Sequence, residues 1–152
     1  MTAIQDLMAT NHCYGCGAAN KDGLQIKSHW HGDECVCTYM PRPEQCAGPL
    51  HYLYGGTIAS LIDCHSVGTA VANYYRLEGR EIGEGEEIWC VTGQLHVNYL
   101  EPTPIDREVT LRAVIEECGE RKTIVKCRLY SGDTLTTAAK VTAVRVPNSW
   151  KE

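Results

Sequence analysis

The sequence predicts an α+β domain in which an antiparallel sheet wraps around one long central helix. Between Gly55 and Tyr75 the only formal charge is Asp63, and most other side chains are small or apolar at roughly helical spacing. A helix of this composition can be approached closely on several sides. Alternating segments typical of strands precede it and follow it. A curved sheet of those strands is the simplest structure that buries such a helix.

The length of 152 residues is typical of a single domain with a sizeable core. The net charge is -5 and charges of both signs are interleaved, so we expect binding neither to nucleic acid nor to an anionic membrane. No segment has the pattern of a secretory signal or a membrane span, which predicts a cytoplasmic protein. The nine cysteines are scattered and odd in number, so we expect them to be mostly reduced.

The first 23 residues form a lead-in that carries two cysteines at metal-binding spacing. Cys13 and Cys16 form a C-x-x-C pair within a glycine-rich turn, after a short amphipathic segment at residues 1–10. A closed structural zinc site needs four ligands, and the sequence offers no second C-x-x-C or H-x-x-x-H pair. We therefore expect a packed turn without metal and a protein without cofactor. A metal bound at Cys13 and Cys16 is the less favoured alternative.

Strands flank the central helix on both sides. Two strands joined by a turn at residues 31–33 are predicted within residues 24–40, followed by a loop rich in proline and glycine. The helix is expected over residues 55–76, and the charged segment 78–87 after it as a solvated loop. Four further strands are expected over residues 89–99, 109–118, 122–130 and 135–146.

The strand over residues 89–99 alternates cleanly between two sets of side chains. Its odd-numbered residues, Trp89, Val91 and Leu95 among them, are expected to face the helix. His96 and Asn98 then face away from the helix, toward solvent or a subunit contact.

The start of the helix and Asp63 together have the chemistry of acyl transfer. Gly55 and Gly56 allow a tight turn and leave helix-initial amides available, which can stabilise a developing oxyanion. Two turns later, the Asp63 carboxylate can act as a nucleophile or as a general base toward water. A purely structural role for a buried carboxylate would require a cation or several N–H donors, and the neighbouring sequence offers none. We therefore predict hydrolysis of a reactive acyl compound such as a thioester.

Three segments carry a resemblance to a known family. Residues 54–63, YGGTIASLID, are similar to the pattern HGG-x-x-x-x-L-x-D/E. Residues 13–24, CYGCGAANKDGL, are similar to an opening C-x-x-C-G-x-x-N-x-x-G-L, and residues 97–104, VNYLEPTP, to a strand and proline segment after the helix. In this order the segments resemble the hotdog-fold acyl-CoA thioesterases, especially their phenylacetate-type (PaaI-like) branch. The resemblance extends from about residue 13 to residue 146.

This resemblance implies a hotdog fold, with homodimers or dimers of dimers whose active site lies at the dimer interface. It also implies an acyl-CoA substrate that is hydrolysed to free acid and CoA. Asp63 falls on the catalytic acid of the family, and Gly55 on the glycine whose backbone amide polarises the thioester carbonyl. Gly56 supports the turn. These three residues are the predicted catalytic set.

The predicted substrate-binding residues follow the family pattern less closely. Tyr54 stands where the family has a histidine, and His51, three residues earlier, is a candidate to compensate. Some members carry a hydroxyl one turn after the acid, where Val67 stands here with Ser66 beside it. We assign Tyr54, His51 and Ser66 to substrate binding and expect His65 to be a structural histidine. The departure at Tyr54 leaves a second reading open, a non-catalytic hotdog module that binds an acyl-CoA or a related ligand.

Overall fold

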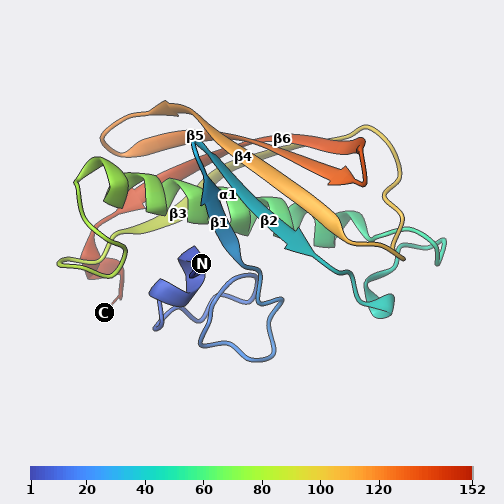
Figure 1. Cartoon of the computed structure of the whole chain (residues 1–152), viewed down its shortest axis with the longest axis horizontal. Helices are drawn as coiled ribbons and strands as arrows, with labels where there is room; N and C mark the ends of the chain where they lie inside the picture. Colours follow the sequence, from blue (N-terminus) through green and yellow to red (C-terminus); the bar gives the residue numbers. More distant parts are fainter. Residues whose placement is uncertain (152) are drawn as a thin grey trace.

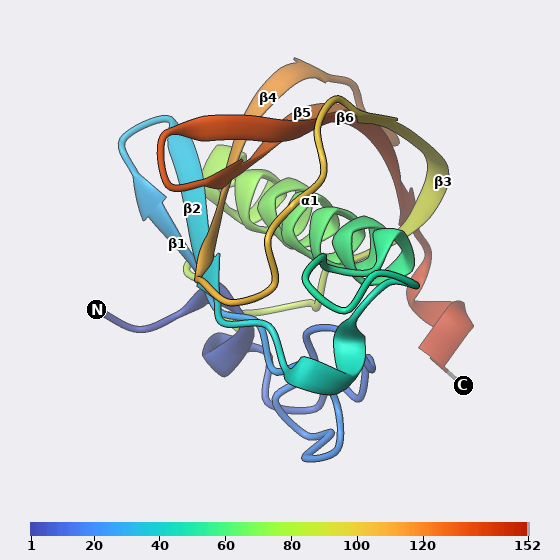
Figure 2. The ribbon, with the colours of Figure 1, turned by 90° about the vertical axis from the view of Figure 1, so that its right-hand side faces the viewer.

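Six antiparallel strands form one sheet that curves over a single long helix. The computed structural model describes residues 1–151 and gives the order β1-β2-β4-β5-β6-β3 across the sheet. The helix α1 (Gly55–Leu77) lies beneath the concave face of this sheet (Figures 1 and 2). The strands are β1 (Ser28–His31), β2 (Glu34–Tyr39), β3 (Trp89–Tyr99), β4 (Val109–Cys118), β5 (Lys122–Ser131) and β6 (Thr134–Val146). The predicted α+β architecture is therefore confirmed.

The central helix is enclosed by the sheet on one side and by the N-terminal lead-in on the other (Figure 2). Leu61, Ile62 and Ala70 are completely buried, as are the residues of β4, β5 and β6 that face them, such as Leu111 and Val141. This enclosure explains why apolar residues of α1 are not confined to one narrow stripe. Although α1 has 23 residues, neither it nor any other described helix is apolar enough over a sufficient length to cross a membrane.

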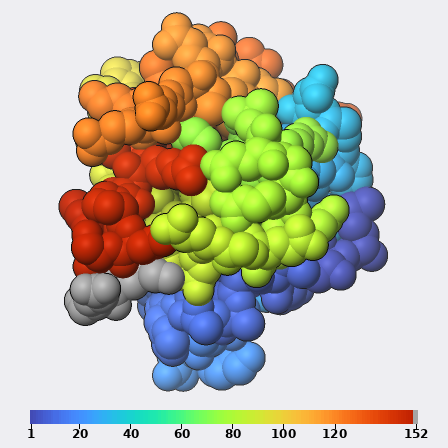
Figure 3. Space-filling model, turned by 90° about the vertical axis from the view of Figure 1, so that its left-hand side faces the viewer, coloured from blue at the N-terminus to red at the C-terminus, as the bar shows by residue number. Residues whose placement is uncertain are grey.

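Three short 3-10 helices lie outside the sheet: η1 (Ile4–Leu7) in the lead-in, η2 (Pro43–Gln45) before α1, and η3 (Asn148–Lys151) after β6. The charged loop after α1, residues 78–87, lies at the surface beside the lead-in, as Figure 3 shows. Arg80 holds this loop in place because its guanidinium donates hydrogen bonds to the carbonyl oxygens of Glu84 and Glu86. The predicted solvated loop is thus confirmed, and the side chain of Arg80, within the loop, orders it.

The first predicted strand is shorter than the sequence pattern suggests. Alternation from residue 24 predicts a strand that begins there, but β1 begins at Ser28. Gln25 has a φ of 56°, which is incompatible with an extended strand. Its side-chain amide donates instead to the carbonyl oxygens of Gly17 and Asn20. Residues 24–27 therefore belong to the turn-rich lead-in rather than to the sheet.

A bulge in β3 reverses the direction of its side chains midway along the strand. The register between β3 and β6 shifts between Thr92 and Gln94, which leaves Gly93 in the bulge. A β-carbon at Gly93 would lie only 2.8 Å from Cγ2 of Val144, so the close approach of β6 requires glycine there. As a result, Thr92 on one side of the bulge and Tyr99 on the other both contact α1.

The predicted uniform alternation along β3 is therefore wrong at its start. The even-numbered Cys90 packs against the core and Thr92 contacts α1, while Trp89 and Val91 also line the cavity beside α1. Beyond the bulge Val97 packs against the core as expected, whereas Leu95, also expected to face the helix, is 38% exposed. A β-bulge inserts one residue into the period-2 pattern and re-aims every side chain beyond it.

A buried hydrogen-bond chain joins the lead-in to the helix and the sheet. Gln5 donates from Nε2 to Oγ of Ser28 at 3.0 Å, and the Ser28 amide donates to Gln5 Oε1 at 2.7 Å. The Ser28 hydroxyl is then free to donate to Nδ1 of His65 at 2.7 Å, and Nε2 of His65 donates to the Cys35 carbonyl oxygen at 2.9 Å. His65 is completely buried. The expectation that His65 is a structural histidine is confirmed by these contacts.

Protonation of His65 should make the stability of the fold depend on pH. Burial lowers the pKa of His65 from 6.5 to about 4, so the unfolded chain binds this proton more tightly than the folded chain. The contribution to stability is complete above pH 6.5 and is lost as the pH falls toward 4. We expect the free energy of unfolding to drop by about 2 kcal/mol from this group between pH 7 and pH 5.

Denaturant unfolding at both pH values measures this drop. His65→Gln keeps a neutral side chain that can donate and accept, so it should be less stable at pH 7 but lack this part of the pH dependence. His96→Gln, at an exposed histidine of β3, is the matched control and should keep the full drop. An equal drop in the His65→Gln variant would contradict the assignment.

Candidate active site

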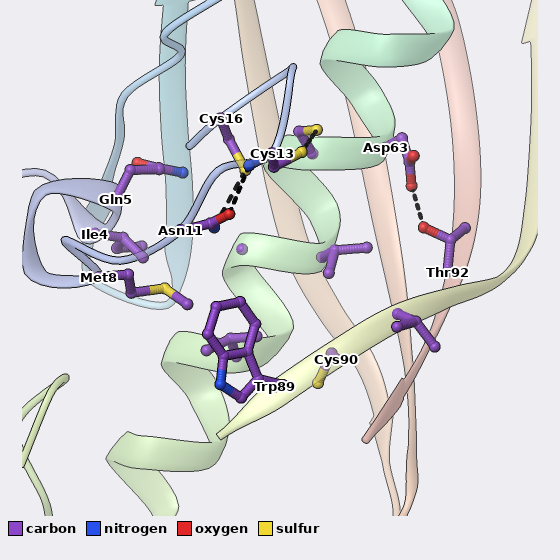
Figure 4. A pocket seen from close by; sticks show the side chains of 15 residues that line it. Ile4, Gln5, Met8, Asn11, Cys13, Cys16, Asp63, Trp89, Cys90 and Thr92 are labelled. Carbon is purple, nitrogen blue, oxygen red and sulfur yellow. Dashed lines mark hydrogen bonds between the residues drawn. The ribbon is translucent and has the colours of Figure 1, made fainter. Parts of the chain in front are cut away.

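Asp63 lies two turns into α1 and faces the first half of β3. Its Oδ1 accepts a hydrogen bond of 2.5 Å from the Thr92 hydroxyl, which the β3 bulge turns toward the helix (Figure 4). The side chain is half-buried, and no ion pair among the described residues includes it. No side-chain cation of the described residues therefore pairs with Asp63 as a purely structural carboxylate would need.

The environment of Asp63 makes its carboxylate more basic than an exposed one. Burial raises the pKa of Asp63 above its usual 3.8, the Thr92 hydrogen bond opposes this rise, and negative charge at Cys13 adds to it. Because the first effect is the largest, the net pKa is raised. Carboxylates with raised pKa values are typical of general acid and base sites.

A cavity of about 300 Å³ extends from Asp63 between α1, the start of β3 and the lead-in. Apolar side chains form much of its wall, including Met8, Val67, Val71 and Trp89. Figure 4 shows Asp63 and Thr92 together at one side of this space, with Trp89 and Met8 farther along it. Cavities of this size and chemistry are typical of small-molecule sites.

The start of α1 forms a second feature with the chemistry of a site. Gly55 is the first residue of the helix, Tyr54 precedes it as the N-cap, and no side chain caps this end. The first amides of a helix have no partner within the helix. The Tyr99 hydroxyl donates to the Gly55 carbonyl oxygen at 2.7 Å and fixes this end against β3. Gly55 lines a cavity of about 390 Å³ that does not include Asp63.

Gly55 and Asp63 are not brought together within one chain. Eight residues along an α-helix correspond to a rise of about 12 Å. A single thioester carbonyl is far smaller than this separation, and the two residues line different cavities. Any reaction that uses both residues on one carbonyl must therefore take them from two copies of the chain.

The predicted substrate-binding residues lie outside the Asp63 cavity. The Tyr54 side chain is 56% exposed and its ring lies against Gly56 at the start of α1. His51 is exposed in the preceding loop, where its carbonyl oxygen accepts a hydrogen bond from the Ile105 amide. Ser66 is completely buried on the sheet side of α1, next to Cys127. In one chain, then, Tyr54 and His51 belong to the Gly55 end, and Ser66 belongs to the core.

Comparison with known proteins identifies the family of this chain. A family model described as the thioesterase superfamily matches residues 50–138. The chain belongs to the thioesterase superfamily. A solved structure of a thioesterase superfamily protein from Shewanella loihica PV-4 is 34% identical, and the match covers 92% of this chain and 98% of that chain with a TM-score of 0.70. The predicted hotdog fold of the thioesterases is thereby confirmed.

Two further proteins are similar to this chain. The acyl-coenzyme A thioesterase THEM4 of Xenopus laevis is 28% identical over 109 residues, which are 72% of this chain but 43% of that relative. The chain thus spans less than half the length of this curated relative. A phenylacetic acid degradation-related protein from Ralstonia eutropha JMP134 is 17% identical over 93% of this chain and 98% of that chain, with a TM-score of 0.69, and shares the fold.

The structure places two residues beside Asp63 that the sequence of this thioesterase-superfamily chain did not predict as site residues. Thr92 contacts Asp63 only because of the bulge, and Gly93 within an otherwise regular strand is the signal that could have indicated it. Cys64, which follows Asp63 directly, lies against Cys13 and Cys16 of the lead-in. No spacing rule indicates this contact, because about fifty residues separate the partners.

Proposed function

We propose that this protein hydrolyses an acyl-CoA thioester to a free acid and CoA. The observation that carries the proposal is Asp63, a half-buried carboxylate with a raised pKa, no ion-pair partner among the described residues and an apolar cavity beside it. Membership of the thioesterase superfamily supports the reaction type. The relative in Xenopus laevis, an acyl-coenzyme A thioesterase by name, supports the substrate class.

In the proposed reaction the Asp63 carboxylate takes a proton from water while the water oxygen attacks the thioester carbon. The carbonyl oxygen becomes an oxyanion, which the backbone amide of Gly55 stabilises. The carbon–sulfur bond then breaks, and the departing CoA thiolate takes the proton back from Asp63. Direct attack by Asp63 as a nucleophile is the variant of this route, and it needs the same ionised carboxylate.

The active site is proposed to form between two copies of the chain, in a homodimer or a dimer of dimers. β3 is an edge strand of the sheet, and its residues 92–96 are exposed. Exposed edges readily pair with another chain. Thr92, near one end of β3, contacts Asp63, and Tyr99, at the other end, contacts Gly55. Antiparallel pairing of two β3 strands about a two-fold axis would place the Gly55 end of one copy beside Asp63 of the other.

A panel of acyl-CoAs that vary in chain length and aromatic character tests the proposal. CoA release is followed chromatographically, because the nine cysteines of the chain would react with thiol reagents. We expect turnover of at least one member of the panel that depends on Asp63. Binding of acyl-CoA without any Asp63-dependent release of CoA would instead support the non-catalytic module that Tyr54, in place of the family histidine, leaves open.

Thr92 should set the pH at which Asp63 becomes active. Its hydrogen bond stabilises the ionised carboxylate, so Thr92→Val should raise the pKa of Asp63 further. The acidic limb of the kcat/KM profile should then move to higher pH, while the plateau changes less. Thr92→Ser keeps a hydroxyl at this position and should leave the limb near its wild-type place. A profile that Thr92→Val leaves unmoved would argue against Asp63 as the titrating group.

A further inference from the structure

Three cysteine thiols meet at the wall of the Asp63 cavity, although two come from the lead-in and one from the central helix. The sulfur atoms of Cys13, Cys16 and Cys64 all lie within 4.8 Å of one another, and Sγ of Cys13 is 3.6 Å from Sγ of Cys64. All three are free cysteines. Cys13 and Cys16 lie on the lead-in side of the cavity in Figure 4, across from Thr92 on β3. The cluster therefore adjoins the proposed site without supplying a group to the proposed reaction.

The backbone of the lead-in is shaped to bring these thiols together. Gly15 lies directly against Cys64, where a β-carbon would overlap the Cys64 sulfur. The Gly17 amide donates to the Cys13 carbonyl oxygen at 2.8 Å and closes the turn. The Cys13 amide donates to Asn11 Oδ1 at 2.9 Å, which fixes the turn on its other side. These contacts hold Cys13 and Cys16 in a fixed turn against Cys64.

The cluster is open to ions from solution. Cys13 is exposed, and Cys16 and Cys64 are partly buried. Among the described residues that line the cavity there is no lysine or arginine. A thiolate in this setting is a ligand for a cation from solution.

We propose that Cys13, Cys16 and Cys64 bind a zinc ion through three thiolates, with the fourth position open toward the cavity. Thiolates are preferred ligands of zinc, and zinc–sulfur bonds of about 2.3 Å in a tetrahedral site hold the sulfurs about 3.8 Å apart. The observed sulfur positions are close to this spacing. Zinc binds thiolates, so binding releases the remaining thiol protons of the cluster to solvent and becomes tighter as the pH rises.

Further contacts support a metal site rather than chance proximity of thiols. The Asn11 side-chain amide donates to Sγ of Cys16 at 3.9 Å, as an outer-shell partner of a ligand would (Figure 4). Zinc sites that bind water or a substrate as the fourth ligand also have three protein ligands and one open position. The expectation of no metal rested on the absence of a second ligand pair in the sequence, and the fold supplies Cys64 from the central helix.

Metal titration of the reduced full-length protein tests this proposal independently of any thioesterase activity. After removal of metal with a chelator, Co²⁺ serves as the spectroscopic probe and Zn²⁺ as the competitor. We expect one Co²⁺ per chain with thiolate-to-cobalt charge-transfer absorption, displaced by one equivalent of Zn²⁺. Protein purified without chelator should contain about one zinc per chain by elemental analysis.

Cysteine variants locate the site. Cys13→Ser and Cys64→Ser should lose the charge-transfer signal and weaken zinc binding by more than the roughly 10–100-fold that loss of an outer-shell partner costs. Cys90→Ser is the matched control, because Cys90 lines the same cavity but lies outside the cluster, and it should bind as the wild type does. Zn²⁺ should raise the urea midpoint of the wild type and of Cys90→Ser but not of Cys64→Ser, provided each variant shows a native far-UV spectrum.

Two results would overturn the proposal. The first is a reduced wild-type protein that binds neither Co²⁺ nor Zn²⁺ stoichiometrically. The second is equal loss of binding in Cys90→Ser and Cys64→Ser. A Cys13–Cys64 disulfide in the purified protein, together with no metal binding after its reduction, would identify the cluster as a redox pair instead.

Discussion

Replacement of Asp63 by asparagine should lower kcat for acyl-CoA hydrolysis by about 10²–10⁴-fold, which is the usual contribution of a positioned base. Asparagine has nearly the same shape, and its side-chain oxygen can still accept the Thr92 hydrogen bond. The variant should therefore fold and bind acyl-CoA as the wild type does, but it cannot take a proton from water or attack the thioester. Single-turnover rates and calorimetric binding of the same acyl-CoA separate these two effects.

Asp106→Asn is the matched control for this variant, because it removes one carboxylate from an exposed position far along the chain. It should change neither rate nor binding. In the wild type, kcat/KM should fall as the pH falls through the pKa of Asp63, which burial places above its ordinary value. Turnover by Asp63→Asn close to that of the wild type would remove Asp63 from the mechanism.

The fold follows from patterns that are local in the sequence. The small and apolar residues around Asp63 predict the enclosed helix, and the observed α1 begins at the predicted residue and extends one residue farther, to Leu77. The alternating segments predict the strands β2 to β6 within a few residues. These predictions succeed because helix and strand periodicities differ and because the turns between strands carry glycine. The predicted β1 began too early, since Gln25 adopts a positive φ that alternation does not reveal.

The surroundings of Asp63 depend on contacts that are distant in the sequence. Thr92 reaches Asp63 because Gly93 lets β6 approach and shifts the register by one residue. Cys64 meets Cys13 because the lead-in folds back beneath α1, a contact that no local pattern encodes. Asp63 itself was predictable, since a lone charge in an enclosed helix is costly unless it has a function. What the sequence could not supply is which side chains complete its environment.

Gly55→Pro should reduce kcat by about 10²–10³-fold, the usual cost of losing one oxyanion donor. Proline removes the amide hydrogen of the first helical residue and leaves the rest of α1 intact, because proline is well tolerated at this position. Tyr54, the preceding residue, has φ −61° and ψ 132°, which is the conformation that a following proline requires. The loss should appear in kcat more than in acyl-CoA binding, since the oxyanion exists only after attack.

Gly55→Ala separates the loss of the amide hydrogen from a change of shape. Its β-carbon would lie 3.5 Å from the Tyr99 ring, an ordinary contact, and its amide remains a donor. Activity close to the wild type in Gly55→Ala, with the large loss confined to Gly55→Pro, is the expected pattern.

Gly55 and Asp63 are proposed to act across two protomers. A mixture of inactive Asp63→Asn chains and inactive Gly55→Pro chains should therefore regain activity, because some mixed dimers pair an intact Gly55 with an intact Asp63. Mixtures that stay inactive after exchange of subunits would place both residues in one protomer's site, against the separation of about 12 Å along α1.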